Sequence, residues 1–254
     1  MESVLSIKGL GKQFGGLKAV ADLDLEIEER DLVGLIGPNG AGKTTVFNLI
    51  TGIYTPDGGD IVFCGKSIAG LKPYQIAQRG VARTFQNIRL FNDLTVTDNI
   101  RVACHPRIDY GLAAAVFRTR GFWREEKEID EKAADLLSIL NLHGRRDEIA
   151  KNLPYGEQRR LEIARALATG PRLLLLDEPA AGMNPQETVK LMDLINFIRE
   201  KFEVTILLIE HQMRVVMSVC QRIAVMDFGQ KIAEGSCKEV QNDPKVIEAY
   251  LGKG

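Results

Sequence analysis

The stretch Gly37-Pro38-Asn39-Gly40-Ala41-Gly42-Lys43-Thr44 decides the fold class of this chain. It matches the pattern G-x-x-x-x-G-K-[ST], follows the apolar run Leu32–Ile36, and precedes a helix-like pattern that ends near Gly52. A loop without obstructing side chains lets backbone N–H groups point at phosphate oxygens, and a helix N-terminus adds partial positive charge. The sequence therefore predicts a strand, a phosphate-binding loop and a helix in direct succession.

Two acidic residues complete the candidate phosphate site. Asp177 and Glu178 follow the apolar run Leu173–Leu176, and parallel α/β folds bind ligands at the carboxyl ends of their strands. Lys43 is expected to contact the terminal phosphates, whereas Thr44 and Asp177 are expected to hold Mg²⁺. Glu178 can orient or deprotonate the attacking water. We therefore expect ATP and Mg²⁺ as cofactors, with nucleotide contacts from Gly37, Pro38, Asn39, Gly40, Ala41, Gly42, Lys43, Thr44 and Thr45.

Four apolar runs predict a parallel sheet. They are continuous rather than alternating, and helical patterns separate them, which is typical of strands covered on both faces. The runs are Leu32–Ile36, Leu173–Leu176, Val204–Ile209 and Arg222–Asp227, with a helix expected over Gln212–Val219. Together with the phosphate loop, they indicate an α/β fold with the parallel-sheet core of a P-loop NTPase.

Two further regions differ from this core. Val4–Ile7 and Ala19–Ile27 alternate apolar and polar residues, which predicts an antiparallel β subdomain that Ile61–Phe63 can join. From about residue 87 to residue 170 the pattern is helical. We therefore predict one domain over residues 1–254, in which a helical subdomain of approximately residues 87–170 is inserted into the α/β core.

The composition excludes several classes of protein. The 254 residues are 45% hydrophobic and 26% charged, which is unlike a disordered tail, a collagen-like fibre or a small disulfide scaffold. The net charge of −1 gives no reason to expect a nucleic-acid partner. The four cysteines are not spaced as metal or redox pairs. We expect no signal peptide, and no apolar run is long enough to span a bilayer.

Further motifs follow the phosphate loop. Thr84-Phe85-Gln86 comes first and Leu153-Pro154-Tyr155-Gly156-Glu157-Gln158-Arg159 second, whereas Ala181-Gly182-Met183-Asn184-Pro185 and His211 come after Glu178. In this order the chain resembles the ATP-binding subunits of ABC transporters along essentially its whole length. The four segments are similar to that family's Q-loop, signature motif, D-loop and switch histidine, respectively. Phe14 stands where the family places an aromatic ring against adenine.

The resemblance implies a mechanism in which two ATPase domains sandwich two ATP molecules head to tail. It implies that Gln86 senses Mg²⁺ and the attacking water, and that His211 contacts the γ-phosphate, so that Glu178, His211 and Gln86 are the expected catalytic residues. The expected contacts to the partner's ATP come from Pro154, Tyr155, Gly156 and Glu157, and Asn184 is the expected D-loop residue.

The implied partners follow from the same resemblance. They are transmembrane permease subunits, a second ATPase subunit that is the same or a related chain, and indirectly a solute-binding protein. The implied location is peripheral, at the cytoplasmic face of the inner membrane.

Three residues depart from the family's pattern. Pro154 replaces the signature serine, Tyr155 its first glycine, and Asn184 the usual D-loop aspartate. Proline suits the first turn of a helix, where we expect Pro154 to lie. With these differences and the C-terminal stretch 242–252, the chain resembles the ATPases of branched-chain amino-acid importers. Related urea or amide importers and lipopolysaccharide exporters remain alternatives, whereas a soluble chromosome ATPase would need coiled-coil heptads that the sequence lacks.

An arginine-rich stretch follows the Q-loop region. Between Arg79 and Arg124 there are eight arginines, no lysine and three acidic residues, and the aromatic residues include Phe122 and Trp123. The stretch is either a solvated charged face or a docking surface, since arginine and aromatic residues are enriched at interface centres. A docking surface would meet the permease subunits or anionic lipid headgroups.

Overall fold

The computed structural model describes residues 3–105 and 116–251. The chain forms two compact units. The first comprises residues 1–86 and 172–254, and the second comprises residues 87–171. Within the described residues, no helix is both long enough and apolar enough to cross a membrane.

A mostly parallel sheet forms the core of the first unit. Its strand order is β10-β9-β3-β8-β7-β6, and β10 is antiparallel to β9 while the other pairs are parallel. Every residue of β3, β7 and β8 is buried, because helices accompany these strands as the continuous apolar runs predict. The strands are β3 (Leu32–Ile36), β6 (Val81–Arg83), β7 (Leu173–Asp177), β8 (Thr205–Ile209), β9 (Arg222–Asp227) and β10 (Gln230–Gly235).

Six helices lie in the described part of the same unit. The helix α1 starts directly at the end of the phosphate loop, and α7 and α8 connect strands of the parallel sheet. The helices are α1 (Lys43–Ile50), α2 (Pro73–Gln78), α7 (Pro185–Phe202), α8 (Met213–Val219), α9 (Cys237–Asn242) and α10 (Pro244–Leu251).

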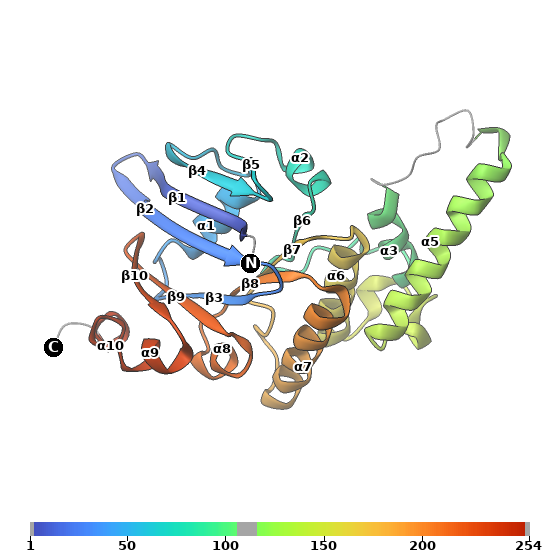
Figure 1. The fold of residues 1–254 in the computed structure, drawn as a ribbon. Helices are drawn as coiled ribbons and strands as arrows, with labels where there is room; N and C mark the ends of the chain where they lie inside the picture. Colours follow the sequence, from blue (N-terminus) through green and yellow to red (C-terminus); the bar gives the residue numbers. More distant parts are fainter. Residues whose placement is uncertain (1–2, 106–115, 252–254) are drawn as a thin grey trace. The chain divides into compact units, whose positions relative to one another are not determined.

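An antiparallel sheet is the other layer of strands in the first unit. Its order is β2-β1-β4-β5, and β1 and β2 form a long hairpin (Figure 1). In β2, Leu23, Leu25 and Ile27 are buried while the residues between them are exposed, as the alternating pattern predicts. The strands are β1 (Ser3–Phe14), β2 (Leu17–Glu28), β4 (Gly58–Phe63) and β5 (Lys66–Ser67).

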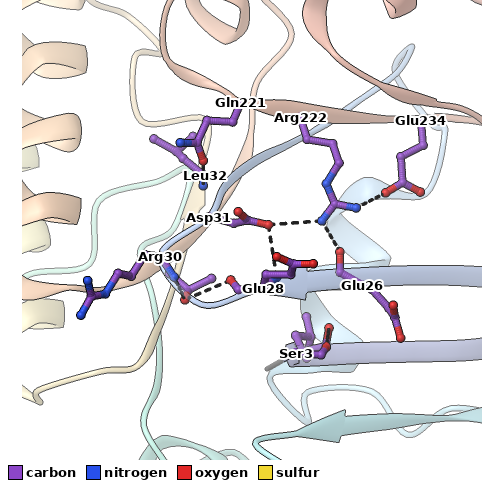
Figure 2. A network of polar contacts seen from close by, with 11 residues as sticks. Ser3, Glu26, Glu28, Arg30, Asp31, Leu32, Gln221, Arg222 and Glu234 are labelled. Atoms are coloured by element: carbon purple, nitrogen blue, oxygen red, sulfur yellow. Dashed lines mark hydrogen bonds and ion pairs between the residues drawn. The ribbon is translucent and has the colours of Figure 1, made fainter. Parts of the chain in front are cut away.

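A polar network joins the two sheets near the start of β3 and β9 (Figure 2). The Arg222 guanidinium donates to the Glu26 carbonyl at 2.5 Å and pairs with Glu234 at 2.5 Å and Asp31 at 3.3 Å. The backbone N–H of Leu32 donates to the Gln221 side chain at 3.3 Å. Because the network lies at the amino ends of these strands, their carboxyl ends remain available for the candidate site.

The described part of the second unit is helical. It contains α3 (Val96–Cys104), α5 (Arg120–Ile139) and α6 (Tyr155–Ala168), with short 3₁₀ helices at His143–Arg145 and Ala150–Asn152. The side chain of Arg159 in α6 is completely buried and pairs with Glu162 at 2.8 Å. A buried arginine is tolerated because its charge is paired.

The predicted fold class is confirmed: a P-loop parallel sheet, an antiparallel sheet and an inserted helical part are all present. Two edge strands of the parallel sheet, β6 and β10, were not expected. The strand β6 has only three residues, and β10 is largely half-buried rather than apolar. The assignment of residues 1–254 to one ATPase domain stays a prediction.

Candidate functional site

The phosphate loop connects β3 to α1 and has a backbone that only glycine tolerates at two positions. Gly37 has φ 150° and Gly42 has φ 102°, both in the left-handed half of conformational space. A Cβ atom would lie 2.0 Å from the Met226 carbonyl oxygen at Gly37, and 2.3 Å from the Ala19 carbonyl oxygen at Gly42. One side of the loop backbone therefore packs against β9 at Met226 and β2 at Ala19, and the opposite side is the one that a ligand can approach.

Lys43, the first residue of α1, lies at this loop. Its side chain is buried and donates to the carbonyl oxygens of Gly37 at 2.7 Å and Pro38 at 2.9 Å. Burial lowers the pKa of the Lys43 amine, whereas the nearby carboxylates of Glu178 and Asp177 raise it. The first N–H groups of a helix have no intrahelical partner, so the start of α1 and the Lys43 amine are together suited to bind an anion.

Glu178 is the point at which three predicted catalytic residues meet. The Gln86 amide donates to Glu178 Oε2 at 2.8 Å, and His211 Nδ1 lies 3.6 Å from the same oxygen. Glu178 has φ 45°, and its N–H donates to the Ile209 carbonyl at 2.9 Å. A left-handed conformation in a residue other than glycine is costly and is often found at functional sites. The structure thus brings together the ends of β7 and β8 and the segment after β6.

Asp177 is buried and forms an ion pair that the sequence did not reveal. Its Oδ2 atom lies 2.7 Å from Arg83 Nη2, and the two side chains are 5% and 6% exposed. The other terminal nitrogen of Arg83 donates to Asn48 Oδ1 in α1 at 2.7 Å. The partners lie 94 residues apart, and no local motif indicates that they meet.

Two more residues near the site were also missed. The completely buried Glu210 accepts from the N–H groups of Ala180 at 3.0 Å and His211 at 3.3 Å, and burial raises the pKa of its carboxyl. Burial likewise raises the pKa of Tyr250 in α10, and a hydrogen bond with the Gly37 backbone counters that shift. The only sequence signal for Glu210 was its place directly before His211 at the end of an apolar run.

The remaining predicted residues of the first unit lie at the ends of elements. Phe14 ends β1, is 41% exposed, and packs edge-on against Tyr54 at a centroid distance of 5.0 Å. Asn184 is the N-cap of α7: its side chain accepts from the Glu187 N–H at 2.9 Å, and Glu187 accepts in return from the Asn184 N–H at 3.1 Å. Asparagine and aspartate cap helices equally well, so the departure at this position preserves the local structure.

Comparison with known proteins places this geometry in a family. Residues 20–181 match the family model described as "ABC transporter", and residues 230–254 match the one described as "Branched-chain amino acid ATP-binding cassette transporter". The chain belongs to the ABC transporter family. Its phosphate loop and the strand that ends at Asp177 are therefore parts of an ABC ATPase, which binds and hydrolyses a nucleotide.

Similar ABC proteins cover nearly the whole chain. The high-affinity branched-chain amino acid transport ATP-binding protein BraF of Pseudomonas aeruginosa is 48% identical over 98% of both chains. Its counterpart LivG of Escherichia coli K12 is 47% identical over 99% of both. The lipopolysaccharide export system ATP-binding protein LptB of Haemophilus influenzae is 35% identical over 99% of this chain and 98% of its own. The ADP conformation of MJ1267, an ATP-binding cassette of an ABC transporter, has a TM-score of 0.85 at 32% identity and complete coverage of both chains.

The predicted signature residues lie in the second unit, whereas the phosphate loop lies in the first. Pro154 is the N-cap of α6, with φ −55° and ψ 150°. The expectation that it lies in the first turn of the helix was wrong by one position. The Pro154 carbonyl oxygen accepts from the N–H groups of Glu157 at 2.9 Å and Gln158 at 3.0 Å. Proline fits because the N-cap conformation is extended and its fixed φ suits either position.

The other predicted signature side chains form contacts within the second unit. The Tyr155 hydroxyl accepts from Arg159 Nη2 at 3.2 Å, and the Tyr155 side chain is nevertheless substantially exposed. Glu157 pairs with Arg145 at 3.4 Å and with Arg160 at 3.6 Å. Gly156 is half-buried, and a Cβ at this position would meet no atom within 4 Å.

The arginine-rich stretch is only partly described. Arg107, Asp109, Tyr110 and Leu112 lie outside the described residues. At the start of α5, the exposed side chains include two aromatic residues, Phe117 at 80% and Trp123 at 58% exposure. The arginines here are Arg118, Arg120 and Arg124, all exposed, and Arg124 is 3.9 Å from Glu128.

The donor set at the phosphate loop suits Mg²⁺ in the presence of phosphate. No group of three His, Cys, Asp or Glu in the described part of the chain could hold a metal ion by itself. Magnesium usually binds through one or two carboxylates, with phosphates and waters completing its oxygen ligands. The hydroxyl of Thr44, the carboxylate of Asp177 and the amide of Gln86 are oxygen donors of this kind.

Proposed function

We propose that this chain is the ATP-hydrolysing motor subunit of an importer for branched-chain amino acids. The observation that carries the proposal is its near half identity, over essentially the full length, to ATP-binding proteins whose names specify that transport. The match of residues 230–254 to the branched-chain family supports the same assignment.

In the proposed reaction, Glu178 orients the attacking water and accepts its proton. The proposed roles of Gln86 and His211 in positioning that water and the γ-phosphate are supported by their distances of 2.8 Å and 3.6 Å from the same Glu178 oxygen. Lys43 and the N–H groups of the loop and the start of α1 bind the phosphates, and Phe14 packs against the adenine. Mg²⁺, held by Thr44, Asp177 and Gln86, would neutralise charge on the phosphate oxygens.

The proposed partners follow from the subunit's role. Transmembrane permease subunits carry the solute and a solute-binding protein delivers it, so this subunit acts at the cytoplasmic face of the inner membrane. A second ATPase subunit presents Pro154, Tyr155, Gly156 and Glu157 to the ATP bound here, and Asn184 is the proposed D-loop residue. The exposed arginines and aromatic residues at the start of α5 are proposed to dock on the permease, because such residues are typical of interface centres.

Lipopolysaccharide export is the second candidate function. It is supported by the 35% identity to LptB, which also spans the chain. Branched-chain amino-acid uptake is favoured because the identity to BraF and LivG is higher. Urea or amide uptake is a further alternative within the importers.

The test is the uptake of radiolabelled leucine in a strain that lacks its own importer ATPase. The strain is complemented with this chain together with the permease subunits and solute-binding protein encoded by the same source. Restored leucine uptake, absent with the Glu178→Gln variant, is the expected result. Restored uptake of labelled urea without leucine uptake, or copurification with an export permease, would replace the proposed solute while leaving the ATPase role in place.

A further inference from the structure

Arg83 is a buried cation that the proposed mechanism does not use. It is the last residue of β6, three residues before Gln86, and its side chain is 6% exposed. The guanidinium pairs with Asp177 Oδ2 at 2.7 Å and donates to Asn48 Oδ1 at 2.7 Å. One planar group therefore contacts the strand that carries Asp177 and the helix that starts at Lys43.

Two aromatic rings flank the same guanidinium. Its central carbon lies 5.4 Å from the ring centroid of Phe47 in α1 and 4.9 Å from that of Phe85, the residue directly before Gln86. An arginine on aromatic faces gains cation–π attraction, and its fork of donors is rigid. Two polar partners and two aromatic rings together fix the orientation of the Arg83 guanidinium.

Stability alone is a poor reason for this arrangement. A buried ion pair often contributes no more than apolar residues of similar volume would, because both charges lose their hydration. The Nε atom of Arg83 is moreover buried without a hydrogen-bond partner among the described residues, which is a further cost. A costly group that joins three functional segments indicates a role in the site.

We propose that Arg83 is a positioning residue, which fixes the Asp177 carboxylate for Mg²⁺ by binding one of its oxygens and tying it to Asn48 and to the segment of Gln86. The inference rests on the proposed role of Asp177. Arg83 contacts neither phosphate nor metal in this scheme. Arg83 holds the Asp177 carboxylate in one rotamer. Because Arg83 binds Oδ2, this rotamer also fixes the direction of Oδ1.

The first experiment needs neither metal nor nucleotide. Thermal unfolding in EDTA is measured for the wild type, Arg83→Gln, Asp177→Asn and the double variant. Each single variant leaves a buried charge without its partner, so each lowers Tm, and the double variant should lose less than the sum of the two shifts. Strictly additive shifts would show that the two side chains are not coupled and would overturn the inference.

The second experiment measures Mg²⁺ binding in the full-length chain. A fluorescent ATP analogue is titrated in EDTA and then at rising Mg²⁺, which gives the Mg²⁺ concentration for half-maximal enhancement of nucleotide binding. Arg83→Lys keeps the charge but replaces the fork with a point charge. The half-maximal concentration should rise about tenfold or more, as for other partners of metal ligands, while the affinity in EDTA changes less than about twofold. Asn48→Ala should produce a smaller rise.

Arg222→Lys is the matched control. Arg222 also bonds to three partners with its guanidinium, but at the opposite end of the strands. Its replacement should lower Tm without changing the Mg²⁺ requirement. If Arg83→Lys behaves like Arg222→Lys, Arg83 is structural and the inference fails.

The Asp177→Asn variant separates that failure from a failure of the proposed function. If Asp177→Asn raises the Mg²⁺ requirement and Arg83→Lys does not, only the inference about Arg83 is wrong. If Asp177→Asn leaves the requirement unchanged, the assignment of Asp177 to Mg²⁺ is wrong and the role of Arg83 falls with it. If Arg83→Lys does not fold, the Mg²⁺ requirement of Asn48→Ala and the unfolding measurements on Arg83→Gln and Asp177→Asn test the inference in its place.

Discussion

The substitution Pro154→Ser tests whether the start of α6 weakens the proposed ATP sandwich. Pro154 is the N-cap of this helix and supplies only its carbonyl oxygen to the first turn. Proline has neither a side-chain acceptor for the N–H of Glu157 nor an N–H for the Glu157 carboxylate. Serine has both, and a serine N-cap followed three residues later by Glu157 forms the S-x-x-E pattern of a capping box.

The expected magnitudes follow from these groups. An N-cap hydroxyl contributes about 1 kcal/mol to helix stability, whereas loss of proline's rigidity in the unfolded chain costs about 0.4–1 kcal/mol. Pro154→Ala loses the rigidity without gaining the hydroxyl, so Pro154→Ser should exceed Pro154→Ala by about 1 kcal/mol, or about 2–4 °C in Tm.

A hydroxyl has one donor and two acceptor positions, so the capping serine can still donate to a phosphate of the partner's ATP. A hydrogen bond to a charged group is worth about 1.5–3 kcal/mol, and a symmetric dimer contains two of them. The ATP-dependent dimer of Pro154→Ser should therefore be tighter than that of Pro154→Ala by about a hundredfold to ten-thousandfold.

Both variants are made in the Glu178→Gln background and compared by sedimentation with ATP and Mg²⁺, while Tm is measured without nucleotide. Equal dimer constants for the serine and alanine variants would refute the idea that a missing hydroxyl weakens the sandwich. Equal Tm values would refute the capping argument independently. A higher Tm with an unchanged dimer constant would mean that the hydroxyl serves only the helix.

Three further predictions concern other parts of the chain. Glu178→Gln should retain ATP binding, nearly abolish hydrolysis and trap an ATP-bound dimer in sedimentation, because opening waits for cleavage. Charge reversal at Arg118, Arg120 and Arg124 should weaken copurification with permease subunits while leaving nucleotide affinity unchanged. Burial raises the pKa of Glu210, so the folded state binds more protons than the unfolded state above pH 4.5. As the pH rises from 4.5 to the folded-state pKa, the wild type should lose free energy of unfolding relative to Glu210→Gln in urea titrations.

Each of these predictions has a control and an opposing result. Near wild-type turnover in Glu178→Gln would remove Glu178 from the reaction. The matched control for the arginines is charge reversal at three exposed lysines, Lys66, Lys201 and Lys238, which makes the same change in net charge. Equal copurification of both triple variants would favour a solvated face over a docking surface. A stability difference between wild type and Glu210→Gln that does not change with pH would contradict the assigned shift at Glu210.

The central strands could be predicted from sequence because their apolar residues are continuous. Runs such as Leu32–Ile36 and Arg222–Asp227 coincide with β3 and β9 to the residue. The strand β6 could not be predicted in the same way, because Val81–Arg83 is too short to show a period and ends in a charged residue. The position of Pro154 at the N-cap of α6 could not be predicted either, because the fixed φ of proline is compatible both with the N-cap and with the first turn.

The site could be predicted only where a local motif encodes it. The glycines and Lys43 of the phosphate loop have a fixed spacing because neighbouring backbone groups hold one phosphate chain. Arg83 and Glu210 contact residues 94 and 30 positions away, so these contacts depend on the fold and not on the spacing of a local motif. The pairing of Arg83 with Leu175 across β6 and β7 brings Arg83 within reach of Asp177.

The contact at Glu178 also involves the residue after which the chain enters the second unit. The chain leaves the first unit directly after Gln86 and returns at Arg172, and these two crossings flank the neighbouring strands β6 and β7. Gln86 therefore ends the segment that leads into the second unit, and its amide contacts Glu178 at 2.8 Å. Because Gln86 is the last residue before the second unit, a displacement of that unit would be transmitted to Gln86 through the backbone. Arg83, three residues earlier, pairs with Asp177 at 2.7 Å. The Arg83–Asp177 contact joins two buried side chains, whereas the Gln86–Glu178 contact is exposed, so in the proposed mechanism a displacement transmitted through the backbone would move Glu178 more readily than Asp177.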